Sequence, residues 1–318
     1  MTSPQRILIT GANGLVGQAT AAKLVQQGHT VIGLGQGQRP VVEAEFLDCD
    51  VRDIHLLHAL LGSRHIDSLV HCAAYSGPMV SRSNPHAIVD VNIDGTANLL
   101  EAARIHSIPR FTYLSSITVY GNTTTHGVRE DHPLDATNVY AASKVSGEAL
   151  VAAYRHRYGV HGTSLRISSV YGPGRTTACF VRDLLTNALL ARSTDLPFGS
   201  DFSRQYIYVD DVATAVSAAA TAGLAPRLHA YNITGGQAQT MEQIAARIAA
   251  VVPGVSYTLK PGPDPDDDDA TGELDISAAA EDLGYAPAWP LEEGARKYYA
   301  YLRDRTPLPT GKQDQHDR

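Results

Sequence analysis

The chain has 318 residues, of which 43% are hydrophobic and 19% are charged, and its formal net charge is −7. A chain of this length and composition can bury the core of one large α/β unit, or of a main domain with a smaller lobe. The acidic balance, without a clustered basic face, excludes binding to nucleic acid or to an anionic membrane, because both need local positive charge.

Cysteine content and apolar runs narrow the class further. The three cysteines, Cys49, Cys72 and Cys179, are too few and too scattered for a disulfide framework or a thiolate metal site. No run approaches the roughly 18 apolar residues of a membrane span, and the first strand begins too early to leave room for a signal region. We therefore expect a cytoplasmic protein with free thiols and no metal.

Short β-branched runs alternate with amphipathic helical segments through the first half of the chain. This alternation is typical of parallel strands joined by crossover helices, and it predicts a doubly wound α/β Rossmann sheet. We assign residues 1–170 to this dinucleotide-binding domain. Strands are expected at residues 6–10, 30–34, 68–73, 110–115 and 162–168, and helices at residues 15–27, 84–106 and around Tyr140.

The pattern becomes mixed beyond about residue 171. We expect residues 171–305 to form mainly a smaller substrate-binding lobe over the ligand edge of the sheet, with strands that return to the main sheet. Its helices are expected at residues 178–192, 212–222 and 240–251, and its short strands at residues 205–209 and 231–233.

Two polar segments interrupt or end this second part. Residues 264–269 form an acidic, proline-broken run that we expect to be a solvated loop. Residues 306–318 are polar and interrupted by proline, so we expect a disordered tail.

A glycine-rich turn directly follows the first strand and opens the first helix. Its sequence is Gly11-Ala12-Asn13-Gly14-Leu15-Val16-Gly17. A backbone without side chains can approach a pyrophosphate, whose charge is favoured by the free N–H groups and the dipole at a helix N-terminus. Gly17 would allow the helix and the strand to pack closely. The turn therefore predicts a dinucleotide-binding site.

Tyr140 and Lys144 lie four residues apart in a predicted helix, so both side chains point towards one place. A free phenol has a pKa near about 10, and a nearby fixed positive charge lowers that pKa towards the neutral range. The pair is therefore a candidate acid/base, although ordinary pairs on a helix surface have the same spacing.

The turn and the tyrosine–lysine pair belong to a longer ordered set of motifs. Through this set the sequence resembles the extended short-chain dehydrogenase/reductase family of sugar epimerases and dehydratases, over nearly the whole chain. The ordered segments are Gly11 to Gly17, Asp50-Val51, His71 to Ala74, Asn92 to Thr96, Ser115 to Gly121, Tyr140 to Lys144, Arg166 to Gly174, Arg204 to Val212, and Tyr231 to Ile233.

The resemblance implies NAD or NADP as the cofactor. Asp50 and Val51 would contact the adenine, although Asp50 could instead cap a helix at residues 52–61. Gly35 stands where NAD-binding relatives place an acidic residue. Arg39 could therefore reach a 2′-phosphate or be an ordinary loop residue, and the choice between the two cofactors stays open. The other residues that the resemblance implies for the cofactor are Gly11, Asn13, Gly14, Leu15, Val16, Gly17, Ala73, Ala74, Asn92, Tyr140 and Lys144.

The same resemblance implies three catalytic residues. Tyr140 would be the acid/base, Lys144 would hold the nicotinamide ribose and lower the pKa of the phenol, and Ser116 would hydrogen-bond the reacting oxygen. Ser115 points the other way along the strand and is expected to be structural. Ile117 and Thr118 replace the Asp-Glu pair of the sugar dehydratases, so elimination of water is not expected.

Four further residues are candidates for the substrate. Tyr75 and Ser81 lie in a polar stretch where relatives line the substrate pocket, and Ser169 replaces an asparagine that helps nucleotide-sugar enzymes to bind a diphosphate. Arg204 matches an arginine that pairs with substrate phosphates, or it forms a salt bridge with Asp201. The resemblance also implies a homodimer through the helices at residues 92–104 and 140–158.

These observations support three hypotheses. The leading one is an NAD(P)-dependent oxidoreductase or epimerase that oxidises a secondary hydroxyl of a sugar or nucleotide-sugar, as a 4-epimerase does. The first alternative is a dehydrogenase of a free sugar or sugar acid, which would exchange its cofactor in each cycle. The second is a dinucleotide-binding regulator that has kept the fold and lost the reaction. A complete set of Ser116, Tyr140 and Lys144 argues against the regulator.

Overall fold

A seven-stranded parallel sheet forms the centre of the protein. The computed structural model describes residues 3–37, 44–77, 80, 83–123, 127–223, 227–265, 269–270 and 272–305. In spatial order the strands are β11 (Ala230–Ile233), β6 (His161–Ile167), β5 (Arg110–Ser116), β4 (Ser68–His71), β1 (Arg6–Thr10), β2 (Thr30–Gly35) and β3 (Glu45–Asp48). The winding reverses between β1 and β4, and ligands of open α/β sheets bind at such a point.

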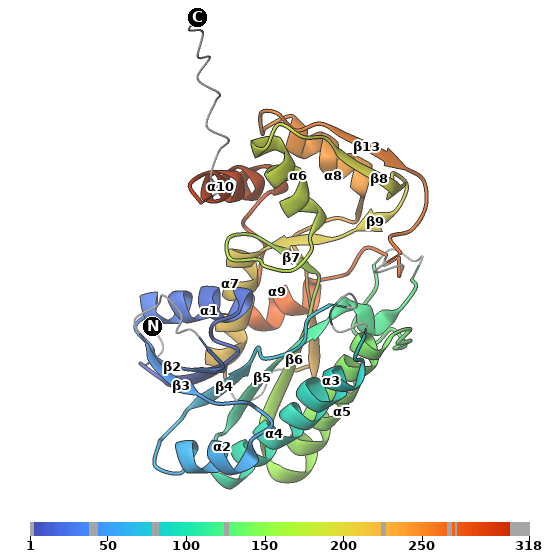
Figure 1. Cartoon of the computed structure of the whole chain (residues 1–318). Helices are drawn as coiled ribbons and strands as arrows, with labels where there is room; N and C mark the ends of the chain where they lie inside the picture. The colour runs from blue at the N-terminus through green and yellow to red at the C-terminus, as the bar shows by residue number, and fades with distance from the viewer. Residues whose placement is uncertain are drawn as a thin grey trace, which may run out of the picture.

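Helices cover both faces of this sheet (Figure 1). One face carries α1 (Leu15–Gln26), α7 (Val209–Thr221) and α9 (Ser277–Leu283). The other carries α2 (Ile54–Leu61), α3 (His86–Val89), α4 (Gly95–Ile105) and α5 (Val139–Tyr158).

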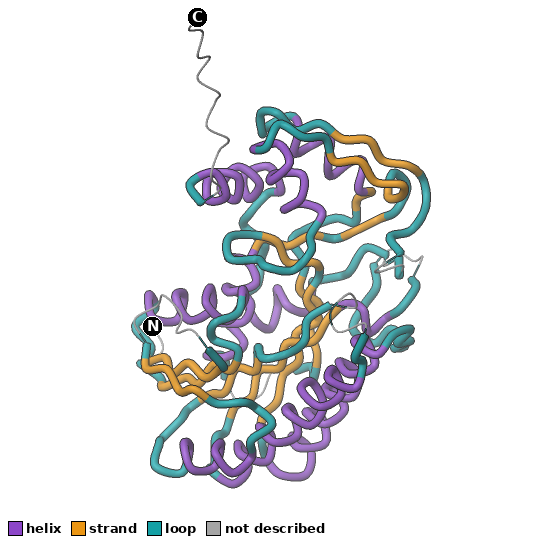
Figure 2. The backbone as a smooth tube through the Cα atoms, viewed as in Figure 1, coloured by secondary structure: helices purple, strands orange, loops and turns teal. Residues whose placement is uncertain are grey.

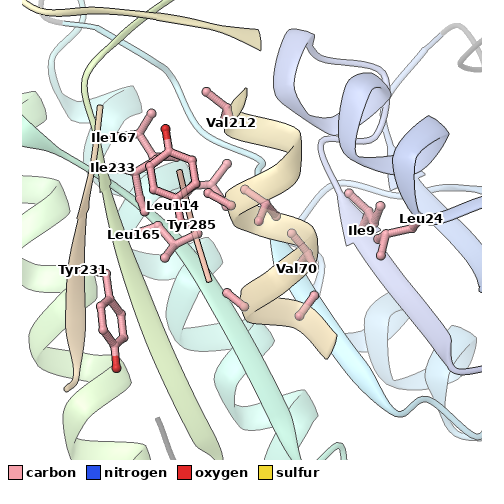
Figure 3. Packing of buried hydrophobic residues seen from close by; sticks show 14 of the residues in the cluster. Ile9, Leu24, Val70, Leu114, Leu165, Ile167, Val212, Tyr231, Ile233 and Tyr285 are labelled. Atoms are coloured by element: carbon pink, nitrogen blue, oxygen red, sulfur yellow. The ribbon is translucent and has the colours of Figure 1, made fainter. Parts of the chain in front are cut away.

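Alternating strand residues build one core on each face, because successive side chains of a strand point in opposite directions. Ile7 and Ile9 of β1 join the cluster under α1 and α7, and Leu8 joins the cluster under α4. Figure 3 shows the first cluster, in which Leu24 of α1 lies beside Ile9 of β1, and to which Val212 of α7 and Val70 of β4 also belong. Near-continuous apolar strands are what a sheet buried on both faces requires.

A smaller lobe lies beyond the carboxyl ends of the strands (Figures 1 and 2). A third apolar cluster holds its helices together. Its helices are α6 (Phe180–Leu189), α8 (Met241–Ala249) and α10 (Leu291–Arg303), and its short strands pair as β7 (Ser169–Tyr171) with β10 (Tyr206–Tyr208), β9 (Ser203–Arg204) with β12 (Gln239–Thr240), and β8 (Thr194–Gly199) with β13 (Tyr257–Lys260). The chain returns from this lobe to the main sheet through α7 and β11.

The structure changes several expected boundaries. The helix expected at residues 84–106 starts as α3, passes through a π-helical stretch at Asp90–Asp94, and continues as α4. The strand expected at residues 205–209 ends at Tyr208, because Val209 already begins α7. The expected tail at residues 306–318 lies outside the described residues.

The prediction of a solvated loop at residues 264–269 is wrong for Asp269. Its side chain is only 4% exposed, and it accepts hydrogen bonds from Asn122 Nδ2 (3.2 Å) and from the Thr137 hydroxyl. Buried carboxylates need such donors, and a sequence run gives no sign of donors that lie far away in the chain. Within the described ranges no helix is long and apolar enough to cross a membrane, and no three His, Cys, Asp or Glu residues group as metal ligands.

His71 ties the reversal point of the sheet to α4. Its ring nitrogens lie 2.8 Å from the Thr10 hydroxyl of β1 and 2.9 Å from the Thr96 hydroxyl of α4. Burial, together with the positive charge of Lys144, lowers the pKa of His71 to about 3. The imidazole therefore stays neutral at physiological pH.

We predict that His71 makes the fold sensitive to acid. The unfolded chain takes up the imidazole proton near pH 6.5 and the folded chain does so only near pH 3, so stability falls as the pH drops through this window. Each pH unit there is expected to cost up to about 1.4 kcal/mol. The free energy of unfolding is measured with urea at pH 7.0, 5.5 and 4.5. Between pH 7.0 and pH 4.5 it should fall by about 2–3 kcal/mol less in His71→Gln than in the wild type. Equal slopes for the two proteins would contradict this role.

Candidate active site

One cavity of about 390 Å³ opens at the carboxyl edge of the sheet, between the sheet and the smaller lobe. It is lined by the glycine turn, the ends of β4, β5 and β6, the start of α5, and the strand β9. Its lining residues include Gly11, Gly14, Leu15, Val16, Gly17, Cys72, Ala74, Tyr75, Leu114, Ser115, Ser116, Ile117, Thr118, Tyr140, Lys144, Ser168, Ser169, Val170, Arg175, Arg204 and Asp269.

The glycine turn forms one wall of the cavity. Gly11 has a φ of +63°, and its carbonyl accepts a hydrogen bond from the N–H of Gly14 (2.9 Å). A Cβ on Gly17 would lie 2.1 Å from the Gly11 oxygen. No side chain caps the N-terminus of α1 at Gly14. The turn thus offers bare backbone and an open helix N-terminus to an anionic group.

We predict that Gly17→Ala loses dinucleotide binding. The added methyl group cannot fit 2.1 Å from the Gly11 oxygen, so the turn must open and move its N–H groups. Affinity for NAD, measured by isothermal titration calorimetry, should fall by at least about tenfold, the effect of losing one or two charge-assisted hydrogen bonds. Gly223→Ala is a matched control, because a Cβ there meets no atom within 4 Å and the residue does not have a left-handed φ.

The ends of β2 and β3 form the rim beside this turn. Asn13 Nδ2 donates to the carbonyl of Gln36 (2.6 Å), and Gln36 Nε2 donates to Asp50 (3.0 Å). The pKa of the Asp50 carboxyl is lowered, mainly by hydrogen bonds from Arg52. The alternative of Asp50 as the cap of α2 is wrong, because Asp53 accepts from the N–H of Leu56 at that position. Arg39 lies outside the described residues.

Three of the expected cofactor residues lie behind the cavity wall. Val51 is buried and its carbonyl accepts from Asn98, and the N–H of Ala73 donates to the Thr10 hydroxyl (3.3 Å). Asn92 does not line the cavity. Its amide bonds the backbone of Tyr75 (2.8 and 3.1 Å) and the Ser143 hydroxyl (3.0 Å). Asn92 therefore holds the stretch that follows β4 against α5.

Tyr140 and Lys144 lie in the first turns of α5. Asn138 caps this helix by accepting from the N–H of Ala141 (2.9 Å). Both side chains are buried, and Lys144 Nζ lies 5.7 Å from the centre of the Tyr140 ring. The ammonium donates to the carbonyl of Leu114 (2.7 Å). This cation favours the ionised form of the neighbouring phenol.

Burial disfavours the charged form of Lys144. It lowers the pKa of this ammonium to about 8, and the opposing pull of Cys72 and Glu148 only partly offsets it. At neutral pH the side chain therefore keeps its proton and its charge.

Ser116 ends β5 and lines the same cavity. Its oxygen accepts from the N–H (3.3 Å) and the hydroxyl (3.0 Å) of Thr118. Because the oxygen is an acceptor in both contacts, the proton of Ser116 remains available for a ligand. Ser116, Tyr140 and Lys144 are thus brought to one place, and their catalytic roles stay predictions.

An ion pair that the sequence did not reveal lies directly behind this group. Glu148 follows Lys144 by one helical turn, accepts from the Ser115 hydroxyl, and forms an ion pair with Arg166 of β6 (2.7 Å). Arg166 also donates to the Tyr120 hydroxyl (2.7 Å). The network locks α5 to β5 and β6. The Ser115 hydroxyl takes part in it, and Ser115 is also among the residues that line the cavity.

Arg204 and Ser169 line the part of the cavity next to the smaller lobe. Arg204 lies over the ring of Phe202, at 4.4 Å, and forms an ion pair with Asp264 (3.7 Å). Asp201, the partner considered from the sequence, accepts instead from the N–H of Gly262 (2.8 Å). Tyr75 lines the cavity and is 39% exposed, and Ser81 lies outside the described residues. Sequence reasoning missed Arg175 and Asp269, which carry no local signal.

The sheet, the glycine turn and the tyrosine–lysine pair together define a dinucleotide-dependent enzyme of the short-chain dehydrogenase/reductase type. A family model described as the NAD dependent epimerase/dehydratase family matches residues 7–234. The chain belongs to this family, in its extended branch, and is an NAD-dependent enzyme.

Relatives match the chain over nearly its full length. The UDP-glucose 4-epimerase of Mycolicibacterium smegmatis is 31% identical, over 95% of this chain and 99% of that protein. UDP-glucuronate 4-epimerase 4 of Arabidopsis thaliana is 28% identical, over 92% and 74%. The solved UDP-glucose 4-epimerase of Thermus thermophilus, in complex with NAD, is 25% identical over 95% and 100%, with a TM-score of 0.84.

The residues around the cavity fit a bound dinucleotide. Because Gly17 has no Cβ, the turn can pack tightly at the start of α1. The uncapped N-terminus of this helix can receive a diphosphate. The Ser168 hydroxyl is buried, lines the cavity and has no hydrogen-bond partner among the described residues. A polar ligand at this end of the cavity would satisfy it.

Proposed function

We propose that this enzyme is a 4-epimerase of a nucleotide-diphosphate hexose. The observation that carries the proposal is the convergence of Ser116, Tyr140 and Lys144 on a cavity that also reaches Arg204. The relatives named as UDP-glucose and UDP-glucuronate 4-epimerases support the same reaction. A free sugar acid would leave the arginine side of the cavity without a phosphate.

In this proposal Tyr140 holds and moves the proton of the substrate. The phenolate form of Tyr140, which the neighbouring Lys144 cation favours, takes the proton of a sugar hydroxyl, and the resulting phenol later returns it to the same sugar oxygen. Ser116 donates its free proton to that oxygen and fixes its position. NAD, when bound, supplies the chemistry of oxidising the sugar carbon and reducing it again.

The pair that follows Ser116 favours epimerisation over dehydration. Elimination of water needs an acid and a base near the sugar, and Ile117 and Thr118 offer no carboxylate. Thr118 is engaged with the oxygen of Ser116. The residues at these two positions therefore support a reaction in which the sugar keeps its hydroxyl groups.

We assign the nucleotide part of the substrate to the smaller lobe. Arg204 and Ser169 would receive the diphosphate, and the dinucleotide would occupy the sheet edge that residues 1–170 provide. Residues 171–305 would then act mainly as the substrate lobe.

The proposal includes a homodimer through α4 and α5. Ile105 and Tyr158 are about half exposed on these helices, and burying them would stabilise a dimer. Multi-angle light scattering measures the mass of the particle in solution, which should be twice that of one chain. A reducing compartment such as the cytoplasm is part of the proposal, since all three cysteines are free.

The test is to incubate the protein with NAD and UDP-glucose and to follow UDP-galactose, its 4-epimer. We expect interconversion without a net rise in absorbance at 340 nm. Steady reduction of NAD with a sugar or a sugar acid, without epimer, would instead establish the dehydrogenase.

A further inference from the structure

One hydroxyl group at the cavity has no partner in the described part of the protein. Ser168 is only 4% exposed and lines the cavity, and its hydroxyl oxygen is buried without a hydrogen-bond partner among the described residues. Most buried hydroxyl groups in proteins are hydrogen-bonded, because an unpaired group has lost its bonds to water without replacing them. A buried, unpaired hydroxyl at the wall of a cavity therefore indicates that a polar group of a ligand meets it there.

Ser168 is the stronger of two such candidates. Nε of Arg175 is also buried without a partner among the described residues, and Arg175 lines the cavity. Protein groups already hold this guanidinium, because its two terminal nitrogens donate to the carbonyls of Val170 (2.6 Å) and Ala178 (2.9 Å). The other buried side-chain atoms without a partner, over the described ranges, belong to residues that do not line the cavity.

The main chain fixes Ser168 where the sheet passes into the smaller lobe. Its N–H donates to the carbonyl of Ile233 in β11 (3.0 Å). The next N–H, that of Ser169, donates to the carbonyl of Gln205 in the lobe (3.0 Å). Gln205 directly follows Arg204. The backbone of Ser168 is therefore held from both sides.

The sugar of the proposed substrate passes this position. Ile167, the residue before Ser168, is the register partner of Ser116, one strand spacing of about 4.8 Å away. In the proposed function the reacting oxygen of the sugar lies at Ser116, and the diphosphate lies at Arg204 and Ser169. The sugar ring has to span the space between these groups, and Ser168 stands between them in the chain.

We infer that the Ser168 hydroxyl binds a hydroxyl group of the sugar and is a substrate-binding residue. The inference rests on the proposed function. A serine hydroxyl can donate and accept, so it can bond a sugar hydroxyl in either direction. The glycine turn at the end of β1 is separated from β6 by β4 and β5. Ser168 therefore belongs to the substrate end of the cavity rather than to the end at this turn.

An unpaired hydroxyl does not stabilise the ligand-free protein. Ser168→Ala removes only this polar group, so we expect its midpoint of urea unfolding, measured without ligand, to be at least that of the wild type. If the hydroxyl instead had a partner within the protein, the variant would lose that bond and its midpoint would fall. Such a fall would contradict a binding role for Ser168.

The main test compares UDP-glucose with UDP, which lacks the sugar, on the NAD-loaded full chain. Calorimetry should show that Ser168→Ala binds UDP-glucose about three- to tenfold more weakly than the wild type does, the effect of one neutral hydrogen bond. Its dissociation constant for UDP, and that of the ligand-free chain for NAD, should change by less than about twofold. In kinetics the KM for UDP-glucose should rise and kcat should stay within about threefold, because the contact is present before and during the reaction.

Ser68→Ala is the matched control. The Ser68 hydroxyl is also buried without a partner among the described residues, but it lies at the start of β4 and outside the cavity lining. We expect this variant to leave the dissociation constants for UDP-glucose, UDP and NAD unchanged.

Each other result has a definite meaning. If UDP-glucose and UDP weaken equally in Ser168→Ala, the hydroxyl meets the nucleotide and not the sugar. If NAD alone weakens, the hydroxyl meets the dinucleotide. Either result, or no change for any ligand, overturns the role of Ser168 and leaves the epimerase intact. A wild type that binds neither UDP-glucose nor UDP overturns the proposed function and this inference with it.

Discussion

Tyr140→Phe is expected to lower kcat by about 10²–10⁴-fold, the contribution that a positioned acid/base makes to a rate. The ring stays in place over Lys144 and only the hydroxyl that carries the proton is lost. Binding of NAD, measured by calorimetry, should change by less than about threefold, because the glycine turn is untouched. The measurement is initial-rate kinetics of UDP-glucose epimerisation with saturating NAD.

Tyr113→Phe is the matched control for this experiment. Its ring lies 5.1 Å from Lys144 Nζ, as close to the ammonium as that of Tyr140, but it is buried outside the cavity lining. We expect near wild-type kcat for this variant. Equal losses in the two variants would mean that proximity to Lys144, rather than proton transfer at Tyr140, controls the rate.

Arg166→Met should lower the free energy of unfolding by about 3–5 kcal/mol, the cost of leaving one partner of a buried ion pair alone. The side chains of Arg166 and Glu148 are 6% and 10% exposed. Removing the guanidinium leaves the Glu148 carboxylate with the Ser115 hydroxyl as its remaining described donor. Urea unfolding followed by circular dichroism measures the loss.

A second variant separates charge from packing. The double variant Arg166→Met with Glu148→Leu removes both charges, and apolar replacement of a whole buried pair is often close to neutral. We expect it to recover most of the lost stability. Arg227→Met breaks an exposed pair with Glu281 and should have a much smaller effect. A double variant as unstable as Arg166→Met would show that packing, not an unpaired charge, causes the loss.

The elements that local patterns specify could be predicted from the sequence. The strands β1, β2, β4, β5 and β6 are short apolar runs between helices, and a parallel sheet with both faces covered requires that pattern. The glycine turn was predicted because Gly17 allows close packing. In the structure a Cβ on Gly17 would meet the Gly11 oxygen. The spacing of Tyr140 and Lys144 was also a local signal, since residues four apart lie on the same side of a helix such as α5.

Features that depend on distant partners were not predictable. Asp269 meets Thr137 across 132 positions and Asn92 meets Ser143 across 51, so neither contact leaves a local trace. The acidic run looked solvated because its composition is polar. Asn92 was expected among the cofactor residues because of its motif. Its amide bonds Tyr75 and Ser143, which the sequence did not indicate, and its role towards the cofactor stays a prediction. The short strands β8 and β13 were not among the expected elements, although less exposed and more exposed residues alternate along most of both of them.

The path of the chain between the two lobes has a consequence for dissection of the protein. After β6 the chain leaves the sheet, and it comes back to supply α7, which packs on α1, and the edge strand β11. A fragment cut at residue 170 would expose the apolar residues that α7 covers and the unpaired backbone edge of β6. We therefore expect the lobes to unfold as one cooperative unit, and limited proteolysis not to release the nucleotide-binding half as a soluble piece.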